Sequence, residues 1–219
     1  MGPGRYGSAV PDLTAPTPPP TSEGAHPPHA PAPRVVLVGP PGAGKSTVAA
    51  ALARHWGVAV RDTDADVEVA AGKPIREIFV DDGESTFRAW EQDAVARALD
   101  EHDGVLALGG GAVLDPQTQA RLTEYRSHGG VVVFLDVSLR HAAPRVGFAT
   151  SRPLLLGNPR AQWQQLMDAR RGVYEAISDV RLLTDAQTPE EIAAQIEAEL
   201  AARDRALADQ PTDTEKDPA

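Results

Sequence analysis

The sequence of 219 residues contains no cysteine, which excludes disulfide bonds and metal sites built from thiolates. It also lacks an apolar stretch of the roughly 20 residues that a membrane-spanning helix needs. The N-terminus shows no charged segment followed by an apolar one, which is the pattern of a secretory signal. Residues 1–33 hold a single arginine, whereas a transit peptide is rich in arginine. We therefore expect a cytoplasmic protein that does not interact with membranes.

Positive charge is also scarce, since 31 acidic residues outnumber 21 basic ones and give a net charge of −10. A nucleic-acid-binding surface would need a basic face. The sequence therefore predicts no nucleic-acid partner, although a local basic pocket is compatible with this balance.

Proline is unevenly distributed and marks one end of the folded part. Ten of the 20 prolines fall within residues 1–33, which hold almost no large apolar side chain. Such a segment cannot offset the entropy lost on ordering, so we expect a disordered Pro/Ala-rich arm. Residues 203–219 are polar and acidic, and we expect a disordered acidic tail there. The remaining residues, 34–202, suit a single domain with one sizeable core.

Within this domain, short apolar runs alternate with helical patterns. Strands are predicted at 34–39, 57–62, 104–109, 130–136 and 180–184. Helices are predicted over 44–55, 84–101 and 160–178, and from Pro189 onwards, where Ile192, Ile196 and Leu200 share one face. This alternation predicts an α/β fold, a three-layer sandwich in which helices cover both faces of a five-stranded, mostly parallel sheet.

The segments of unusual composition all follow predicted strands. A glycine-rich loop follows the first strand, three closely spaced aspartates the second and three glycines the third. A segment with glycine, arginine and proline, residues 144–159, follows the fourth. Parallel α/β sheets bind ligands beyond the carboxyl ends of their strands. We therefore expect these four segments to meet at one crevice.

Residues 39–46, GPPGAGKS, match the phosphate-binding loop pattern. The glycines allow backbone N–H groups to point at phosphate oxygens, and the following helix adds the positive end of its dipole. Lys45 is expected to reach the β- and γ-phosphates of a nucleotide, and Ser46 to bind Mg²⁺. The motif predicts a nucleotide site without specifying the reaction.

Asp62, Asp64 and Asp66 follow the second predicted strand. We expect an extended segment through Asp62 and Asp64. Successive side chains of an extended segment point to opposite faces, so only some of the three aspartates can face the crevice. An acid there can support Mg²⁺, or can accept the proton of a hydroxyl substrate and orient it towards the γ-phosphate. Asp66 lies at a predicted helix start, where a carboxylate favours the helix dipole without any further role. On spacing alone, Asp64 either has a function in the site or is, like Asp66, an acid at a helix start without a further role.

Glycines and arginines complete the candidate set. Gly109, Gly110 and Gly111 either let a ligand approach the main chain or form a tight turn. Arginine is the preferred partner of carboxylates and phosphates, but a single arginine is more often an exposed surface residue. The candidate arginines are Arg88, Arg145, Arg152, Arg170 and Arg171.

Seven motifs together resemble the shikimate kinase family, a group of small P-loop kinases. They are GPPGAGKST, DTDADVE, GKPIREIF, DGESTFRAWE, LGGGAV, SRPLL and LMDARRGVY, and they occur in the order of the family across nearly all of 34–202. The phosphate loop alone is generic, whereas the DTD, FR, GGG and RPLL segments in combination are specific. The resemblance implies a P-loop nucleotide kinase fold with a lid. It also implies transfer of the γ-phosphate of ATP, with Mg²⁺, to the 3-hydroxyl of shikimate by a protein that is usually a monomer.

The resemblance further implies roles for individual residues. The catalytic residues would be Asp64, which holds the acceptor hydroxyl and is the candidate base, Lys45, and the lid residue Arg152. Ser46 would bind the metal and Asp62 would support it. The implied ATP-binding residues are Gly42, Ala43, Gly44, Lys45, Ser46, Thr47, Arg145, Arg152 and Thr188. The implied substrate-binding residues are Asp64, Arg88, Gly110, Gly111 and Arg170, where Arg170 is preferred to Arg171 because LM and Y align around it.

Two other functions stay open. A related small-molecule kinase, such as a gluconate kinase, would share the phosphate loop but would not need the DTD, FR, GGG and RPLL segments together. A nucleotide-binding regulator without activity would be favoured by the loss of Lys45, Asp64, Arg88 or Arg152, and all four are present.

Overall fold

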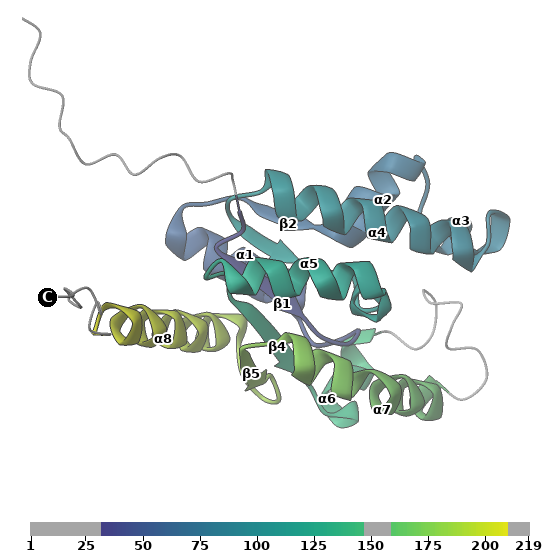
Figure 1. Cartoon of the computed structure of the whole chain (residues 1–219). Helices are drawn as coiled ribbons and strands as arrows, with labels where there is room; N and C mark the ends of the chain where they lie inside the picture. The colour runs from purple at the N-terminus through teal and green to yellow at the C-terminus, as the bar shows by residue number, and fades with distance from the viewer. Residues whose placement is uncertain (1–31, 147–158, 210–219) are drawn as a thin grey trace, which may run out of the picture.

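The computed structural model describes residues 32–146 and 159–209, which fold around one parallel sheet (Figure 1). The strands are β1 (Val35–Val38), β2 (Val60–Asp62), β3 (Val105–Ala107), β4 (Val132–Asp136) and β5 (Val180–Leu183), in the order β2-β3-β1-β4-β5. In the centre, Leu37 of β1 lies between Ala107 of β3 and Val133 of β4. All four strand pairs are parallel, so the predicted five-stranded sheet is confirmed.

Eight α-helices connect or follow the strands in the described residues. They are α1 (Lys45–Trp56), α2 (Thr63–Ala71), α3 (Ile75–Asp81), α4 (Glu84–Glu101), α5 (Pro116–Ser127), α6 (Leu139–Val146), α7 (Pro159–Ile177) and α8 (Pro189–Ala208), with a 3₁₀ turn, η1, at Ala112–Leu114. The predictions for α1, α4, α7 and α8 are confirmed, whereas α3, α5 and α6 were not predicted. A helix start was expected at Asp66, and α2 begins three residues earlier, at Thr63. None of the described helices could span a membrane.

The last helix is longer than the sequence suggested. A capping box between Thr188 and Glu191 starts α8, and alanine-rich, charged turns that favour helix carry it to Ala208. The helix therefore passes the domain boundary expected at residue 202. The predicted arm and the predicted lid segment fall largely outside the described residues.

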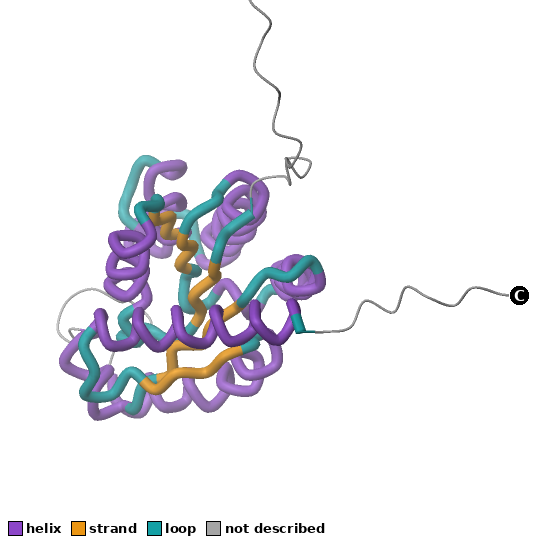
Figure 2. Tube along the Cα trace, turned by 90° about the vertical axis from the view of Figure 1, so that its left-hand side faces the viewer, coloured by secondary structure: helices purple, strands orange, loops and turns teal. Residues whose placement is uncertain are grey.

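Helices cover both faces of the sheet, as the three-layer prediction requires (Figure 2). Helices α1 and α8 pack on each other, while α5 packs against both α4 and α7. Every residue of β1 and β4 is buried, because helices lie on both of their faces. These strands form the centre of the main hydrophobic core.

A smaller core holds α2, α3 and α4 together at one side of the molecule (Figure 1). Val67, Ile78, Phe87 and Ala94 are its buried members, and Phe79 lies against Phe87 with ring centroids 4.6 Å apart. This group of helices forms one wall of the site described below.

Asp136, at the end of β4, fastens α7 to the sheet. Its buried carboxylate accepts hydrogen bonds from Arg171 of α7 at 2.7 and 3.2 Å, and from Arg181 of β5 at 2.7 and 3.1 Å. Burial alone would raise the pKa of Asp136, but the hydrogen bonds from Arg171 and Arg181 outweigh it and hold the pKa below its ordinary value of 3.8. The ionised carboxylate therefore stabilises the fold above that pH.

We expect Asp136→Asn to lower the free energy of unfolding by about 1–2 kcal/mol at pH 7, because the amide loses the charge that both arginines bind. The loss should shrink as the pH falls below about 4, because the carboxylate of the unfolded chain becomes protonated there and that of the folded chain follows at its lower pKa. Denaturant unfolding at pH 7 and pH 3 measures both differences. Asp93→Asn, which affects an exposed pair with Arg97, is the control and should change stability by less than about 0.5 kcal/mol. Equal losses for Asp136→Asn at both pH values would refute this electrostatic role.

Candidate active site

Two cavities, of about 490 and 450 Å³, lie at the carboxyl ends of the strands. They share four lining residues: Pro41, Ser46, Asp62 and Asp64. The first cavity is also lined by the glycine loop after β3, and the second by the phosphate-loop residues and by Arg145, which follows β4. The structure thus brings together parts of all four segments that were expected to converge.

The phosphate loop lines the second cavity through Gly42, Ala43, Gly44, Lys45, Ser46 and Thr47. Gly44 has a positive φ of 90° directly before α1, a conformation that glycine adopts without steric cost. The Lys45 ammonium donates to the carbonyl oxygens of Gly39, at 2.9 Å, and Pro40, at 3.4 Å. The loop therefore surrounds a cation at the N-terminal end of a helix, an arrangement suited to phosphate.

The far end of the second cavity is formed by Arg145 and the start of α8. Arg145 lies 3.4 Å from the carbonyl oxygen of Gly42 and 3.4 Å from that of Thr184. Thr188 is not among the lining residues, since its hydroxyl accepts from the N–H of Glu191 and caps α8. Its neighbours Gln187 and Pro189 line the cavity instead.

Asp62 joins the phosphate loop to α2. One carboxylate oxygen accepts from the Ser46 hydroxyl at 2.6 Å, and the other accepts from the backbone N–H of Asp64 at 3.0 Å. Asp62 is thus the N-cap of α2, and Asp64 lies in the first turn of that helix. The expected extended segment through Asp64 is therefore wrong, because the cap starts the helix at Thr63.

Asp66 belongs to a different contact. Its carboxylate pairs with the Arg61 guanidinium at 2.6 Å, and Arg61 also pairs with Glu101 at 2.9 Å. Asp66 lines neither cavity. Of the three aspartates, Asp62 and Asp64 therefore face the site, while Asp66 holds the first turn of α2 to β2 and α4.

Ser46 and Asp62 together fit a magnesium ion. Both offer oxygen donors, the type of ligand that Mg²⁺ takes, and they lie beside the phosphate loop. Mg²⁺ keeps several waters and commonly binds through one or two protein groups and the phosphates of a substrate. The described residues contain no group of three or more His, Asp or Glu side chains that could hold a metal ion.

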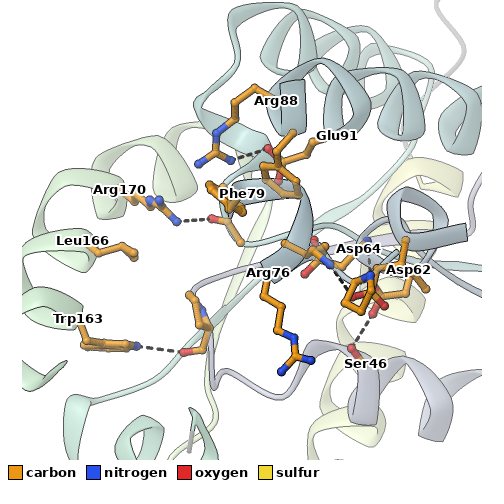
Figure 3. A pocket seen from close by; sticks show the side chains of 18 residues that line it. Ser46, Asp62, Asp64, Arg76, Phe79, Arg88, Glu91, Trp163, Leu166 and Arg170 are labelled. Atoms are coloured by element: carbon orange, nitrogen blue, oxygen red, sulfur yellow. Dashed lines mark hydrogen bonds and ion pairs between the residues drawn. The ribbon is translucent and has the colours of Figure 1, made fainter. Parts of the chain in front are cut away.

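Two arginines face the first cavity from different helices. Figure 3 shows Arg88 of α4 and Arg170 of α7 extending their guanidinium groups towards each other. Arg88 donates to Glu91 at 2.6 Å and to Glu84 at 3.0 Å, and Arg170 donates to the carbonyl oxygen of Gly110 at 3.0 Å. The adjacent Arg171 is bound to Asp136 and does not line the cavity. Together, Arg88 and Arg170 can take up a planar anion such as a carboxylate.

Glu91 is a site residue that the sequence analysis missed. Its side chain is 5% exposed, and it pairs with Arg88 at the cavity wall. Burial raises the pKa of Glu91, and the positive charge of Arg88 offsets this only partly. The signal was present in the sequence, because Glu91 occupies the apolar stripe of α4 that includes Phe87, Val95 and Ala98.

The glycine loop after β3 lies so close to charged side chains that it leaves little room for side chains of its own. A side chain at Gly109 would collide with the carboxylates of Asp64 and Glu91, and one at Gly111 would collide with the Arg88 guanidinium. The N–H of Gly109 donates to the buried Thr63 hydroxyl at 2.9 Å, which ties this loop to the start of α2. The run of glycines therefore permits close packing of the charged groups around it.

Trp163 is a second residue that the sequence analysis missed. It is 1% exposed, lines the first cavity, and donates from Nε1 to the carbonyl oxygen of Pro41 at 3.0 Å (Figure 3). It thereby joins α7 to the phosphate loop. Arg152, the lid residue expected to act in catalysis, lies outside the described residues.

Comparison with known proteins identifies the family of this chain. The shikimate kinase family model matches residues 41–201. The chain is 54% identical to a shikimate kinase of Salinispora arenicola over 171 residues, which cover 78% of this chain and 99% of that relative. It is 52% identical to a shikimate kinase of Streptomyces coelicolor, over 74% of this chain and 91% of the relative.

Comparison with solved structures also identifies a shikimate kinase. A shikimate kinase from Acinetobacter baumannii in complex with shikimate matches with a TM-score of 0.74 and 29% identity, over 79% of this chain and 94% of that one. A gluconokinase from Sinorhizobium meliloti matches with a TM-score of 0.52 and 24% identity, over 80% and 94% of the two chains, which indicates a shared fold only. The chain therefore belongs to the shikimate kinase family.

Proposed function

We propose that this kinase transfers the γ-phosphate of ATP to the 3-hydroxyl of shikimate, giving shikimate 3-phosphate and ADP. The observation that carries the proposal is that Ser46, Asp62 and Asp64 line both cavities. A nucleotide in the second cavity and an acceptor in the first would meet at these residues. The solved relative that holds shikimate supports this choice of acceptor.

In the second cavity, the N–H groups of the phosphate loop would bind the β- and γ-phosphates, and Lys45 would exchange its carbonyl partners for phosphate oxygens. Arg145 and the residues beside Thr188 would hold the adenosine end. Ser46 and Asp62 would hold Mg²⁺, which neutralises the charge that develops on the phosphates. Arg152 would approach the transferring group from the lid.

In the first cavity, Arg88 and Arg170 would bind the carboxylate of shikimate, and Gly110 and Gly111 would line its ring. Asp64 would hold the 3-hydroxyl. In the transfer, the bond between the γ-phosphorus and the oxygen bridging it to the β-phosphate breaks, and a bond from the hydroxyl oxygen to the γ-phosphorus forms. The hydroxyl proton passes to the Asp64 carboxylate, and the electron pair of the broken bond stays with ADP. The monomeric state and the cytoplasmic location stay predictions of the sequence.

The proposed acceptor predicts the outcome of a substrate panel. ADP release from Mg-ATP should be fast with shikimate and close to the rate without acceptor when gluconate or a nucleoside monophosphate is offered. A coupled spectrophotometric assay measures this release. Fast release with another acceptor, or binding of ATP without release in any mixture, would refute the proposal.

The role of Asp64 predicts a second outcome. Asp64→Asn keeps the size of the side chain but removes the proton acceptor, so we expect kcat to fall by about 10²–10⁴-fold. Asp66→Asn is the matched control, because Asp66 lies in the same helical turn but outside both cavities. Circular dichroism should show both variants folded. Wild-type kcat in Asp64→Asn, or equal losses in the two variants, would remove Asp64 from the mechanism.

A further inference from the structure

Arg76 is a third arginine at the first cavity, and none of the roles above uses it. It lies in the first turn of α3 and lines the cavity together with Ser46, Asp62 and Asp64. Figure 3 shows its guanidinium extending into the cavity, well apart from those of Arg88 and Arg170. The side chain is 62% exposed, and its ion pair with the adjacent, exposed Glu77 is long, at 3.6 Å. A pair of this kind is weak and is readily exchanged for a stronger anion.

The backbone that carries Arg76 is held firmly. The carboxylate of Glu68 accepts from the N–H of Ile75 at 3.0 Å and so caps the start of α3 from α2. Ile78 is fully buried in the smaller core. Lys73 pairs with Asp82 at 2.6 Å and with Asp81 at 3.2 Å, which fastens the two ends of the short helix to each other. The position of Arg76 at the cavity is therefore built into the fold.

The charges of the cavity show what Arg76 is suited to bind. Four acidic side chains line it: Asp62, Asp64, Glu68 and Glu91. Of the opposing cations, Arg88 is engaged by Glu84 and Glu91, and Arg170 by the carbonyl oxygen of Gly110. An anion that enters near Asp62 and Asp64 would meet repulsion there unless a cation accompanies it. Beside the Mg²⁺ proposed at Ser46 and Asp62, Arg76 is placed to supply such a cation in the first cavity.

We propose that Arg76 binds the phosphate group of the phosphorylated product, and the same group while it is transferred. The inference rests on the proposed function, which places the accepting hydroxyl at Asp64 and the carboxylate at the pair of Arg88 and Arg170. The end of the acceptor that gains the phosphate is then the end near Arg76. The guanidinium fork matches two phosphate oxygens, whereas a neutral hydroxyl offers it much less.

The test compares two ligands that differ only by the phosphate. Isothermal titration calorimetry would measure the Kd of shikimate and of shikimate 3-phosphate for the full chain and for Arg76→Ala. We expect the Kd of the phosphorylated ligand to rise about tenfold and that of shikimate to change by less than about twofold. Arg76→Lys, which keeps the charge but loses the fork, should fall in between. Arg97→Ala is the matched control, because Arg97 is an exposed arginine of α4 outside the cavity.

The outcomes separate this inference from the proposed function. If wild-type protein phosphorylates shikimate but Arg76→Ala weakens both ligands equally, or weakens neither, Arg76 is not a phosphate ligand and the inference is overturned. If wild-type protein neither binds nor phosphorylates shikimate, the proposed function itself fails. A selective loss for the phosphorylated ligand in Arg76→Ala, with none in Arg97→Ala, supports the assignment.

Discussion

The Asp62 carboxylate is the contact on which the rest of the site depends. One oxygen receives the Ser46 hydroxyl from the phosphate loop, and the other caps α2 through the N–H of Asp64. The phosphate loop and α2 follow different strands, and this carboxylate joins them because parallel strands end at the same edge of the sheet. The cap also fixes where Asp64 lies, at the meeting point of the two cavities. One aspartate thus sets the geometry of both the nucleotide side and the acceptor side.

Helix α7 closes the other wall through several attachments. Trp163 binds the phosphate loop at Pro41, Arg170 and Tyr174 both donate to the carbonyl oxygen of Gly110, and Arg171 binds Asp136 at the end of β4. Neighbouring arginines therefore have separate tasks, because successive residues of a helix point in different directions. A chain with a net charge of −10 can still bind anions, because arginines are concentrated at the cavity. The nearby acids Glu84 and Glu91 are paired with Arg88.

Much of this architecture could be predicted from the sequence. Strand runs, the phosphate loop and the spacing of the aspartates, glycines and arginines indicate the parallel sheet and the convergence at its edge. The start of α2 was wrongly predicted. The segment through Asp62 and Asp64 was expected to be the extended end of a strand, because the capping role of Asp62 was not considered. Glu91 was missed because its place in the apolar stripe of α4 was not considered. Trp163 was missed because its partner, Pro41, lies far away in the chain. Arg76 was missed because nothing local distinguishes an arginine that faces a cavity from one that faces solvent.

In the proposed complex, one acceptor reaches from the pair of Arg88 and Arg170 to Asp64. The most direct test is a crystal structure of the protein with shikimate and Mg-ADP. We predict the carboxylate of shikimate within hydrogen-bond distance of both Arg88 and Arg170, and its 3-hydroxyl within hydrogen-bond distance of Asp64. A carboxylate bound away from these two arginines, or a 3-hydroxyl turned away from Asp64, would contradict the account.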